Sequence, residues 1–179
     1  MLLKALVILL TLCYPFFVYW GLQNDHASSV LILLAAIFVL RWFGGRSSAE
    51  KLIVIASIIG LAATVLLVDE EKGLLFYPVL VNIGLLIIFG SSLFAPQTII
   101  EKIARIKEPS LPPEGVAYTR RVTWVWCIFF VLNGSVSAAT IALGNEQLWM
   151  IYNGIVAYIL IGVLVVGEWI VRYYKKKKL

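Results

Sequence analysis

Charged side chains are scarce in this sequence. Only 14% of its 179 residues are Asp, Glu, Lys or Arg, whereas 61% are hydrophobic. An average soluble domain is roughly one quarter charged and just under half apolar. A water-soluble globule of this length cannot bury so much apolar surface. The composition therefore excludes an ordinary soluble domain and predicts that lipid surrounds most of the chain.

Side chains that commonly carry chemistry are also few. The chain has one histidine, His26, and two cysteines, Cys13 and Cys127, which do not form a Cys-x-x-Cys pair. It contains no Gly-x-Ser-x-Gly, His-Glu-x-x-His or phosphate-binding glycine loop. We therefore predict that the protein is not an enzyme and has no catalytic residues, no metal site and no cofactor. The cysteines are interpreted as free thiols in apolar segments.

What the sequence does contain is a series of six apolar runs. They cover residues 2–22, 27–43, 52–68, 74–95, 122–143 and 148–171. A membrane-spanning helix needs about 20 apolar residues, with about 17 as the lower limit. The predicted fold class is all-α: a single integral membrane domain over residues 1–179, with about six transmembrane helices in one bundle. The runs at 27–43 and 52–68 are the shortest, and a re-entrant pair is the alternative for them.

Basic residues fall almost entirely on one side of this arrangement. If the N-terminus is cytoplasmic, every lysine and arginine except Lys72 belongs to the cytoplasmic side. Lysine and arginine on that side are the main determinant of orientation. We therefore predict that both termini are cytoplasmic, and we attribute the net charge of +5 to topology and lipid headgroups rather than to nucleic acid. Trp149 is expected in the outer interfacial layer, which indole favours.

A short cytoplasmic amphipathic helix is predicted over residues 98–107. Thr98 and Glu101 form a capping box, which marks a helix start. Isoleucines fall on one face, and Glu101, Lys102 and Arg105 fall largely on the other. Such a helix is about 15 Å long, too short to cross, so it should lie flat with its isoleucines at the acyl boundary. The residues predicted to contact anionic headgroups or a partner are Lys102, Arg105, Lys107, Arg120 and Arg121.

Polar residues inside the last three runs form a second candidate site. They are Asn82, Asn133, Ser137 and Asn153. An amide facing lipid would leave hydrogen-bonding groups unpaired, so these residues should point into the bundle. They either hold helices together or line a cavity for a lipid or isoprenoid tail, and both interpretations stay open. Glu168, the one acid inside a run, precedes Arg172 by four residues, which predicts a structural ion pair.

The second half of the chain resembles a known family. Its span and short amphipathic helix are followed by Leu111-Pro112, by Trp126-Cys127-Ile128-Phe129-Phe130 with Gly134, and by Trp149 opening the last span. This pattern resembles the intracellular septation protein A family of bacterial inner-membrane proteins. The resemblance implies a multi-pass protein of the bacterial inner membrane with a part in cell-envelope synthesis or maintenance. Relatives of similar length occur beside genes for lipid or aryl-polyene assembly.

Two positions depart from the family pattern. Ser137 stands where the family usually has an asparagine, and Asn153 stands near a position that is often lysine. The chain therefore resembles a side branch of the family, and a role in septation does not follow.

Three functional hypotheses result. The first is a non-enzymatic scaffold or interaction protein for cell-envelope biogenesis, whose partners are membrane lipids with anionic headgroups and other envelope-biogenesis membrane proteins. The second is a lipid or isoprenoid carrier or permease, with a cavity between spans four and six. The third is a membrane-bound acyl or prenyl transferase that uses Glu108, Tyr118, Arg120 and Arg121. We favour the first, and the sequence leaves the oligomeric state open.

Overall fold

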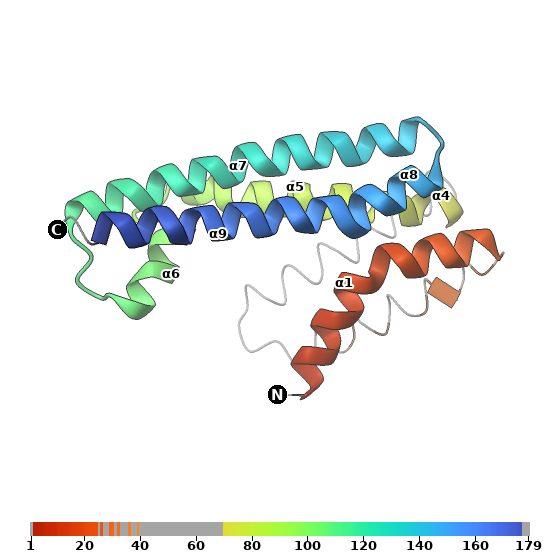
Figure 1. The fold of residues 1–179 in the computed structure, drawn as a ribbon, viewed down its shortest axis with the longest axis horizontal. Helices are drawn as coiled ribbons and strands as arrows, with labels where there is room; N and C mark the ends of the chain where they lie inside the picture. Colours follow the sequence, from red (N-terminus) through yellow and green to blue (C-terminus); the bar gives the residue numbers. More distant parts are fainter. Residues whose placement is uncertain are drawn as a thin grey trace. The chain divides into compact units, whose positions relative to one another are not determined.

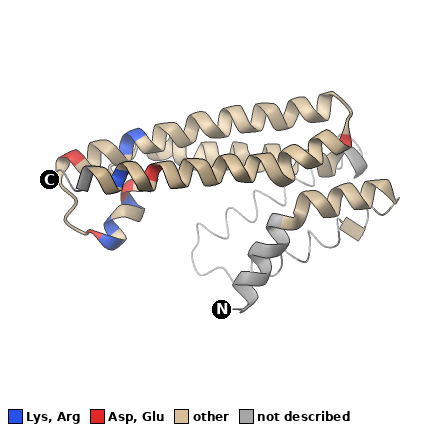
Figure 2. Cartoon of the chain, in the orientation of Figure 1, with Lys and Arg blue, Asp and Glu red and all other residues tan. Residues whose placement is uncertain are grey.

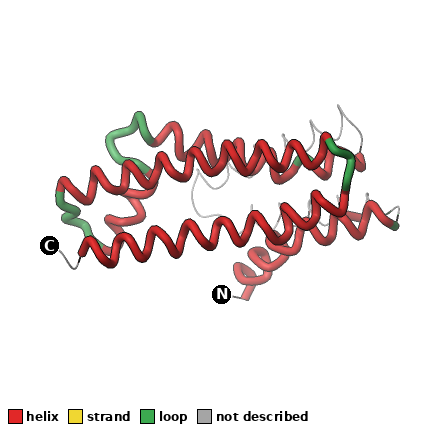
Figure 3. The backbone as a smooth tube through the Cα atoms, turned by 45° about the horizontal axis from the view of Figure 1, so that its top comes forward, coloured by secondary structure: helices red, strands yellow, loops and turns green. Residues whose placement is uncertain are grey.

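The described part of the protein is helical. The computed structural model describes residues 2–24 and 70–176, with isolated positions between 26 and 39, and these residues contain no strand. The elements are α1 (Leu2–Gln23), α4 (Glu70–Leu75), α5 (Tyr77–Ser92), α6 (Ile99–Lys107), α7 (Pro113–Ala142), α8 (Glu146–Ile151), the π-helical turn η1 (Tyr152–Val156) and α9 (Ala157–Lys176). Figure 1 shows their order, and Figure 3 separates the helices from the loops that join them. The predicted all-α class is confirmed for this part of the chain.

Three helical segments in the described part are long and apolar enough to cross a membrane. They are Gly73–Ser92, Pro113–Ala142 and Glu146–Tyr174. These segments overlap the apolar runs predicted at 74–95, 122–143 and 148–171, and α1 follows the run at 2–22. The runs at 27–43 and 52–68 lie outside the continuously described residues. The membrane class is therefore supported, whereas the number six and the single bundle stay predictions.

The helix that carries the run at 122–143 begins before the run does. The run at 122–143 is the apolar part of a longer helix, because α7 already begins at Pro113. Proline is favoured at the first helical position, where its missing N–H would have no intrahelical partner. The apolar run does not include Pro113, so it did not indicate where the helix starts.

The described helices form two compact units. Unit 1 comprises Met1–Val81 and Ser135–Tyr158, and unit 2 comprises Asn82–Gly134 and Ile159–Leu179. Helices α5, α7 and α9 each contribute residues to both units.

The core of unit 1 is built around a break between α4 and α5. A helical carbonyl accepts from the N–H four residues later, and Pro78, four residues after Leu74, has no N–H. The hydroxyl of Tyr14 in α1 donates to this Leu74 carbonyl oxygen. The indole Nε1 of Trp149 in α8 donates to the next carbonyl oxygen, that of Leu75, at 3.0 Å. Two buried side chains from distant segments thus satisfy the carbonyl groups at the break.

The last span passes close to α1 in the same unit. A Cβ atom on Gly154 would lie 3.1 Å from ring atoms of Phe16 and 3.4 Å from Pro15, so glycine allows this approach. Asn153 lies within the π-helical turn, and its side-chain amide donates to the Trp149 carbonyl oxygen at 2.9 Å. Pro15 lies inside α1, which changes direction partway along its length (Figure 1). This agrees with the kink expected of a proline within a helix.

Unit 2 packs α5 against α7 through aromatic rings. Phe89 of α5 lies with its ring centroid 5.2 Å from that of Phe130 and 6.3 Å from that of Trp126. Trp126 and Phe130 are themselves 5.7 Å apart. Offset and edge-to-face contacts of this kind stabilise beyond simple area burial. They pack the C-terminal part of α5 against the middle of α7.

Candidate functional site

The site begins at the junction of α5 and α6 in unit 2. The Ser92 hydroxyl donates to the Phe89 carbonyl oxygen at 2.7 Å and accepts from the Ile99 N–H at 3.1 Å, so it joins the end of one helix to the start of the next. The Thr98 hydroxyl accepts from the Glu101 N–H at 3.2 Å and caps α6. The sequence predicted this start from the capping box.

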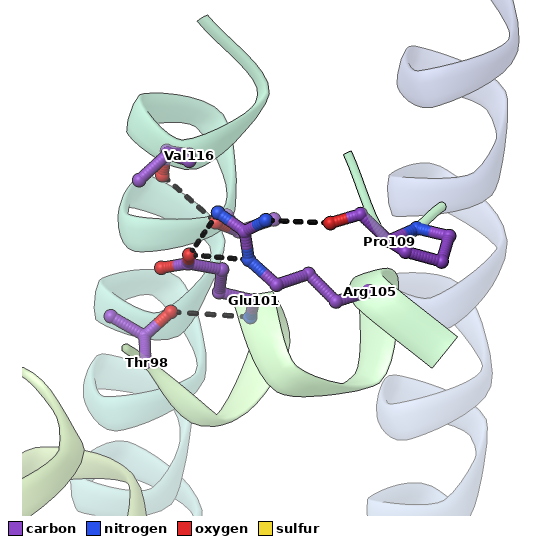
Figure 4. A network of polar contacts seen from close by, with 6 residues as sticks. Thr98, Glu101, Arg105, Pro109 and Val116 are labelled. Carbon is purple, nitrogen blue, oxygen red and sulfur yellow. Dashed lines mark hydrogen bonds and ion pairs between the residues drawn. The ribbon is translucent and has the colours of Figure 1, made fainter. Parts of the chain in front are cut away.

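The buried carboxylate of Glu101 belongs to a set of polar contacts with Arg105 and the Pro109 carbonyl group, here called the clamp. Glu101 is only 3% exposed. Its Oε1 lies 2.8 Å from both Nε and Nη2 of Arg105, and Nη1 of Arg105 donates to the Pro109 carbonyl oxygen at 2.8 Å (Figure 4). The sequence placed Glu101 and Arg105 on the face opposite the isoleucines, and the structure shows that this face turns inward at Glu101. The clamp connects the inward face of α6 to the loop that leads into α7.

The opposite face of α6 is apolar and exposed. Ile103 is 55% exposed and Ile106 is 81% exposed. With Ile99 they follow the i, i+4, i+7 spacing of one helix face. Lys102 and Lys107 are also exposed, and the helical repeat places them on either side of this isoleucine row. The outward surface of α6 is therefore an apolar ridge between two cations.

The five basic residues predicted as one site divide into two groups. Arg105 belongs to the clamp, and Nη2 of Arg120 donates to the Leu93 carbonyl oxygen at 2.7 Å, just beyond the end of α5. A cation there also complements the negative end of the helix dipole. Lys102, Lys107 and Arg121 are exposed, and their side chains make no hydrogen bond or ion pair within the described residues. Figure 2 shows where the charged residues gather on α6 and on the adjoining parts of α7 and α9.

The acid inside the last span is paired. Nε of Arg172 lies 3.5 Å from Oε1 of Glu168, one helical turn away. The Tyr118 hydroxyl of α7 donates to the Glu168 carbonyl oxygen at 3.4 Å. Both partners of the pair are partly exposed, so its contribution to stability is small. The Tyr118 hydrogen bond, not the ion pair, links α7 to α9 within unit 2.

All four residues of the polar set are buried, as their predicted inward direction requires. Nδ2 of Asn133 donates to Oδ1 of Asn82 at 3.1 Å in unit 2. A Cβ on the neighbouring Gly134 would lie 3.1 Å from Cβ of Asn82, so glycine lets α5 and α7 approach there. Ser137 and Asn153 belong to unit 1. Ser137 is completely buried, and its hydroxyl has no hydrogen-bond partner among the described residues.

Sequence reasoning missed the side chains that satisfy the α4–α5 break. Trp149, expected in the outer interfacial layer, is 0% exposed and donates within the protein. Tyr14 was not singled out at all. The available signal was Pro78, which leaves the Leu74 carbonyl without its helical donor and so requires a donor from elsewhere in an apolar environment.

No metal-binding group stands out in the described segments. Three or more His, Cys, Asp or Glu side chains do not gather anywhere in them. Both cysteines are free, with Cys127 buried and Cys13 partly exposed. The absence of a metal or cofactor stays a prediction.

Comparison with known proteins gives one curated relative. The chain is 22% identical over 169 residues to the inner membrane-spanning protein YciB of Hydrogenovibrio crunogenus, covering 92% of this chain and 78% of the relative. That relative is a septation protein A-like protein, so it confirms the resemblance drawn from the motifs. No family model and no solved structure matches. The similarity supports an inner-membrane protein, in agreement with the apolar helices.

Proposed function

We propose that this chain is a non-catalytic scaffold of the bacterial inner membrane that supports cell-envelope biogenesis by holding other membrane proteins. In this proposal the charged end of unit 2, which contains α6 and the adjoining parts of α7 and α9, faces the cytoplasm. Both termini are also cytoplasmic. The orientation rests on the position of lysine and arginine relative to the apolar runs. The envelope setting rests on the septation protein A-like relative.

One observation carries the proposal: charged and phenolic groups that could carry chemistry are used to hold helices. Glu101 and Arg105 form the clamp, and Arg120 binds the end of α5. Tyr118 binds the backbone of α9. A transferase would need such groups free to meet a substrate, and Tyr118 and Arg120 were two of its four candidate residues.

The surface offered to partners is greatest on the last span. In an 18-residue apolar stretch of this span only 11% of the residues are buried within the protein, whereas 33% are buried in the corresponding stretch of α7. Trp169 on α9 is 64% exposed, and aromatic residues commonly anchor protein interfaces. A scaffold needs an exposed helix face of this kind within the bilayer.

Complementation and crosslinking test the scaffold role together. In a deletion strain with an envelope defect, Glu108→Gln and Tyr118→Phe should restore the envelope as well as the natural chain does at equal abundance. A photo-crosslinking phenylalanine analogue at Trp169 should capture a defined set of envelope-assembly membrane proteins. The same analogue at Phe130, which is 5% exposed in the same unit, should capture none. Loss of complementation by the first two variants, or crosslinks from Trp169 to lipid alone, would overturn the proposal.

The carrier hypothesis is supported by one specific observation, the Ser137 hydroxyl. A buried polar group without a partner calls for an explanation, and the polar end of a lipid or isoprenoid ligand is one. Native mass spectrometry of the purified protein would show a retained lipid that Ser137→Ala weakens and Ser135→Ala, at an exposed position on the same helix, does not. Complete exchange of all bound lipid for detergent would dismiss it.

A further inference from the structure

The outward surface of α6 combines exposed apolar side chains with exposed lysines. Such a surface suits neither bulk water nor a protein interior. Ile106 exposes 81% of its side chain and Ile103 exposes 55%, on a helix of nine residues. The exposed lysines Lys102 and Lys107 flank this apolar ridge and have no partner among the described residues. An apolar ridge edged by unpaired cations matches the boundary between acyl chains and anionic headgroups.

The orientation of α6 about its own axis is fixed from the other side. Glu101 and Ala104 face inward, at 3% and 4% exposure. The clamp ties Glu101 through Arg105 to Pro109, while Ser92 and Thr98 hold the helix start. With both ends held, α6 has little freedom to turn its isoleucines inward. The ridge is therefore a permanent outward feature of unit 2.

We propose that α6 is a fixed interfacial helix that binds anionic phospholipids. Ile103 and Ile106 enter the acyl boundary, and the ammonium groups of Lys102 and Lys107 bind the phosphate groups of neighbouring lipids. The partner is the lipid surface itself, because α6 is too short to cross and follows the segment Gly73–Ser92, which is long and apolar enough to span. This proposal does not require the scaffold role.

Spin-label accessibility tests the depth of α6. Single cysteines at Ile103, Ile106 and Ser110 are introduced into the full chain after Cys13 and Cys127 are replaced, and the labelled protein is placed in nanodiscs. Labels at Ile103 and Ile106 should collide more with dissolved oxygen than with a water-soluble nickel chelate. The label at Ser110, in the exposed loop that follows, should show the reverse. Nickel accessibility at Ile106 equal to that at Ser110 would overturn the proposal.

Lipid selectivity tests the role of the lysines. We compare the natural chain with Lys102→Gln/Lys107→Gln and with the charge-retaining control Lys102→Arg/Lys107→Arg. The readout is the ratio of phosphatidylglycerol to phosphatidylcholine retained in native mass spectrometry. The glutamine variant should lower this ratio by about tenfold or more, since each lysine near an anionic surface adds to the attraction, and the arginine variant should keep it. An unchanged ratio in the glutamine variant, or an equal loss in the arginine variant, would contradict headgroup binding.

The two proposals fail separately. Loss of anionic-lipid selectivity in the glutamine variant with no protein crosslinks from Trp169 would support the lipid site and overturn the scaffold. Crosslinks from Trp169 with water-exposed isoleucines on α6 would do the opposite.

Discussion

Replacing Trp149 by alanine is expected to lower the free energy of unfolding in detergent by about 4 kcal/mol, the largest effect of any single substitution proposed for this chain. Trp149 is 0% exposed and lies in the core of unit 1 with Tyr14, Leu74 and Tyr77. Its removal leaves a large cavity and deprives the Leu75 carbonyl oxygen of its indole donor. Denaturation followed by far-ultraviolet circular dichroism measures the loss.

Two further variants separate packing from hydrogen bonding. Trp149→Phe keeps most of the ring volume but removes the donor, so it should cost only about 1–3 kcal/mol. Trp124→Ala is the matched control, because Trp124 is 54% exposed and its loss creates no buried cavity. A stability of Trp149→Ala equal to that of Trp124→Ala would show that the indole does not join α8 to the α4–α5 break.

Arg105→Ala is expected to destabilise α6 more than Glu101→Ala, although the two residues form a single ion pair. The Glu101 side chain is 4% exposed, whereas the Arg105 side chain is 29% exposed. Removing the arginine leaves a carboxylate buried and unpaired, while removing the glutamate leaves a guanidinium that reaches water. We expect roughly 2–3 kcal/mol for Arg105→Ala, below the range for a fully buried pair. The rate of proteolysis in the loop between α6 and α7 measures this local opening.

The double variant provides the internal control. Glu101→Gln in the Arg105→Ala background removes the unpaired charge and should restore part of the protection against proteolysis. Lys107→Ala, which removes an exposed and unpaired cation from the same helix, should leave protection unchanged. Equal sensitivity of Arg105→Ala and Lys107→Ala would refute the clamp.

The sequence predicted best those features that local spacing determines. Thr98 and Glu101 marked the start of α6, and the four-residue spacing of Glu168 and Arg172 placed them one turn apart. The inward direction of Asn82 and Asn133 followed from the cost of an unpaired amide in lipid. Each of these predictions needs only the helical repeat and the solvent around it.

Features that depend on tertiary contacts could not be predicted from the sequence. Nothing local to Trp149 indicates that its partner is the backbone of Leu75, and nothing local to Arg120 indicates the Leu93 carbonyl group. The burial of Glu101 in α6 was not predicted for the same reason. The helical repeat separates its isoleucines from Glu101, but only the contacts made by unit 2 decide which face turns inward. The split of the basic residues into structural and free groups therefore appears only in the structure.

The proposed site also changes the choice of variant for testing lipid contact. Lys102, Arg105 and Lys107 were predicted as one basic site on α6, and a charge-reversal test of that site would change all three together. Because Arg105 holds the clamp, that triple variant would disturb the fold of α6 as well as its surface. Restricting the change to the two lysines leaves the clamp intact and addresses the lipid surface alone.

Cysteine labelling from the two sides of the membrane tests the topology most directly. Two exposed positions are used, in a background without Cys13 and Cys127. Ser110 precedes α7 in the chain, and Gln147, in α8, follows it. A membrane-impermeant maleimide should label Gln147→Cys in intact spheroplasts and should label Ser110→Cys only after the membrane is opened. Labelling of both positions from the same side, or of Ser110→Cys from outside, would contradict a membrane-crossing α7 with the charged end of unit 2 in the cytoplasm.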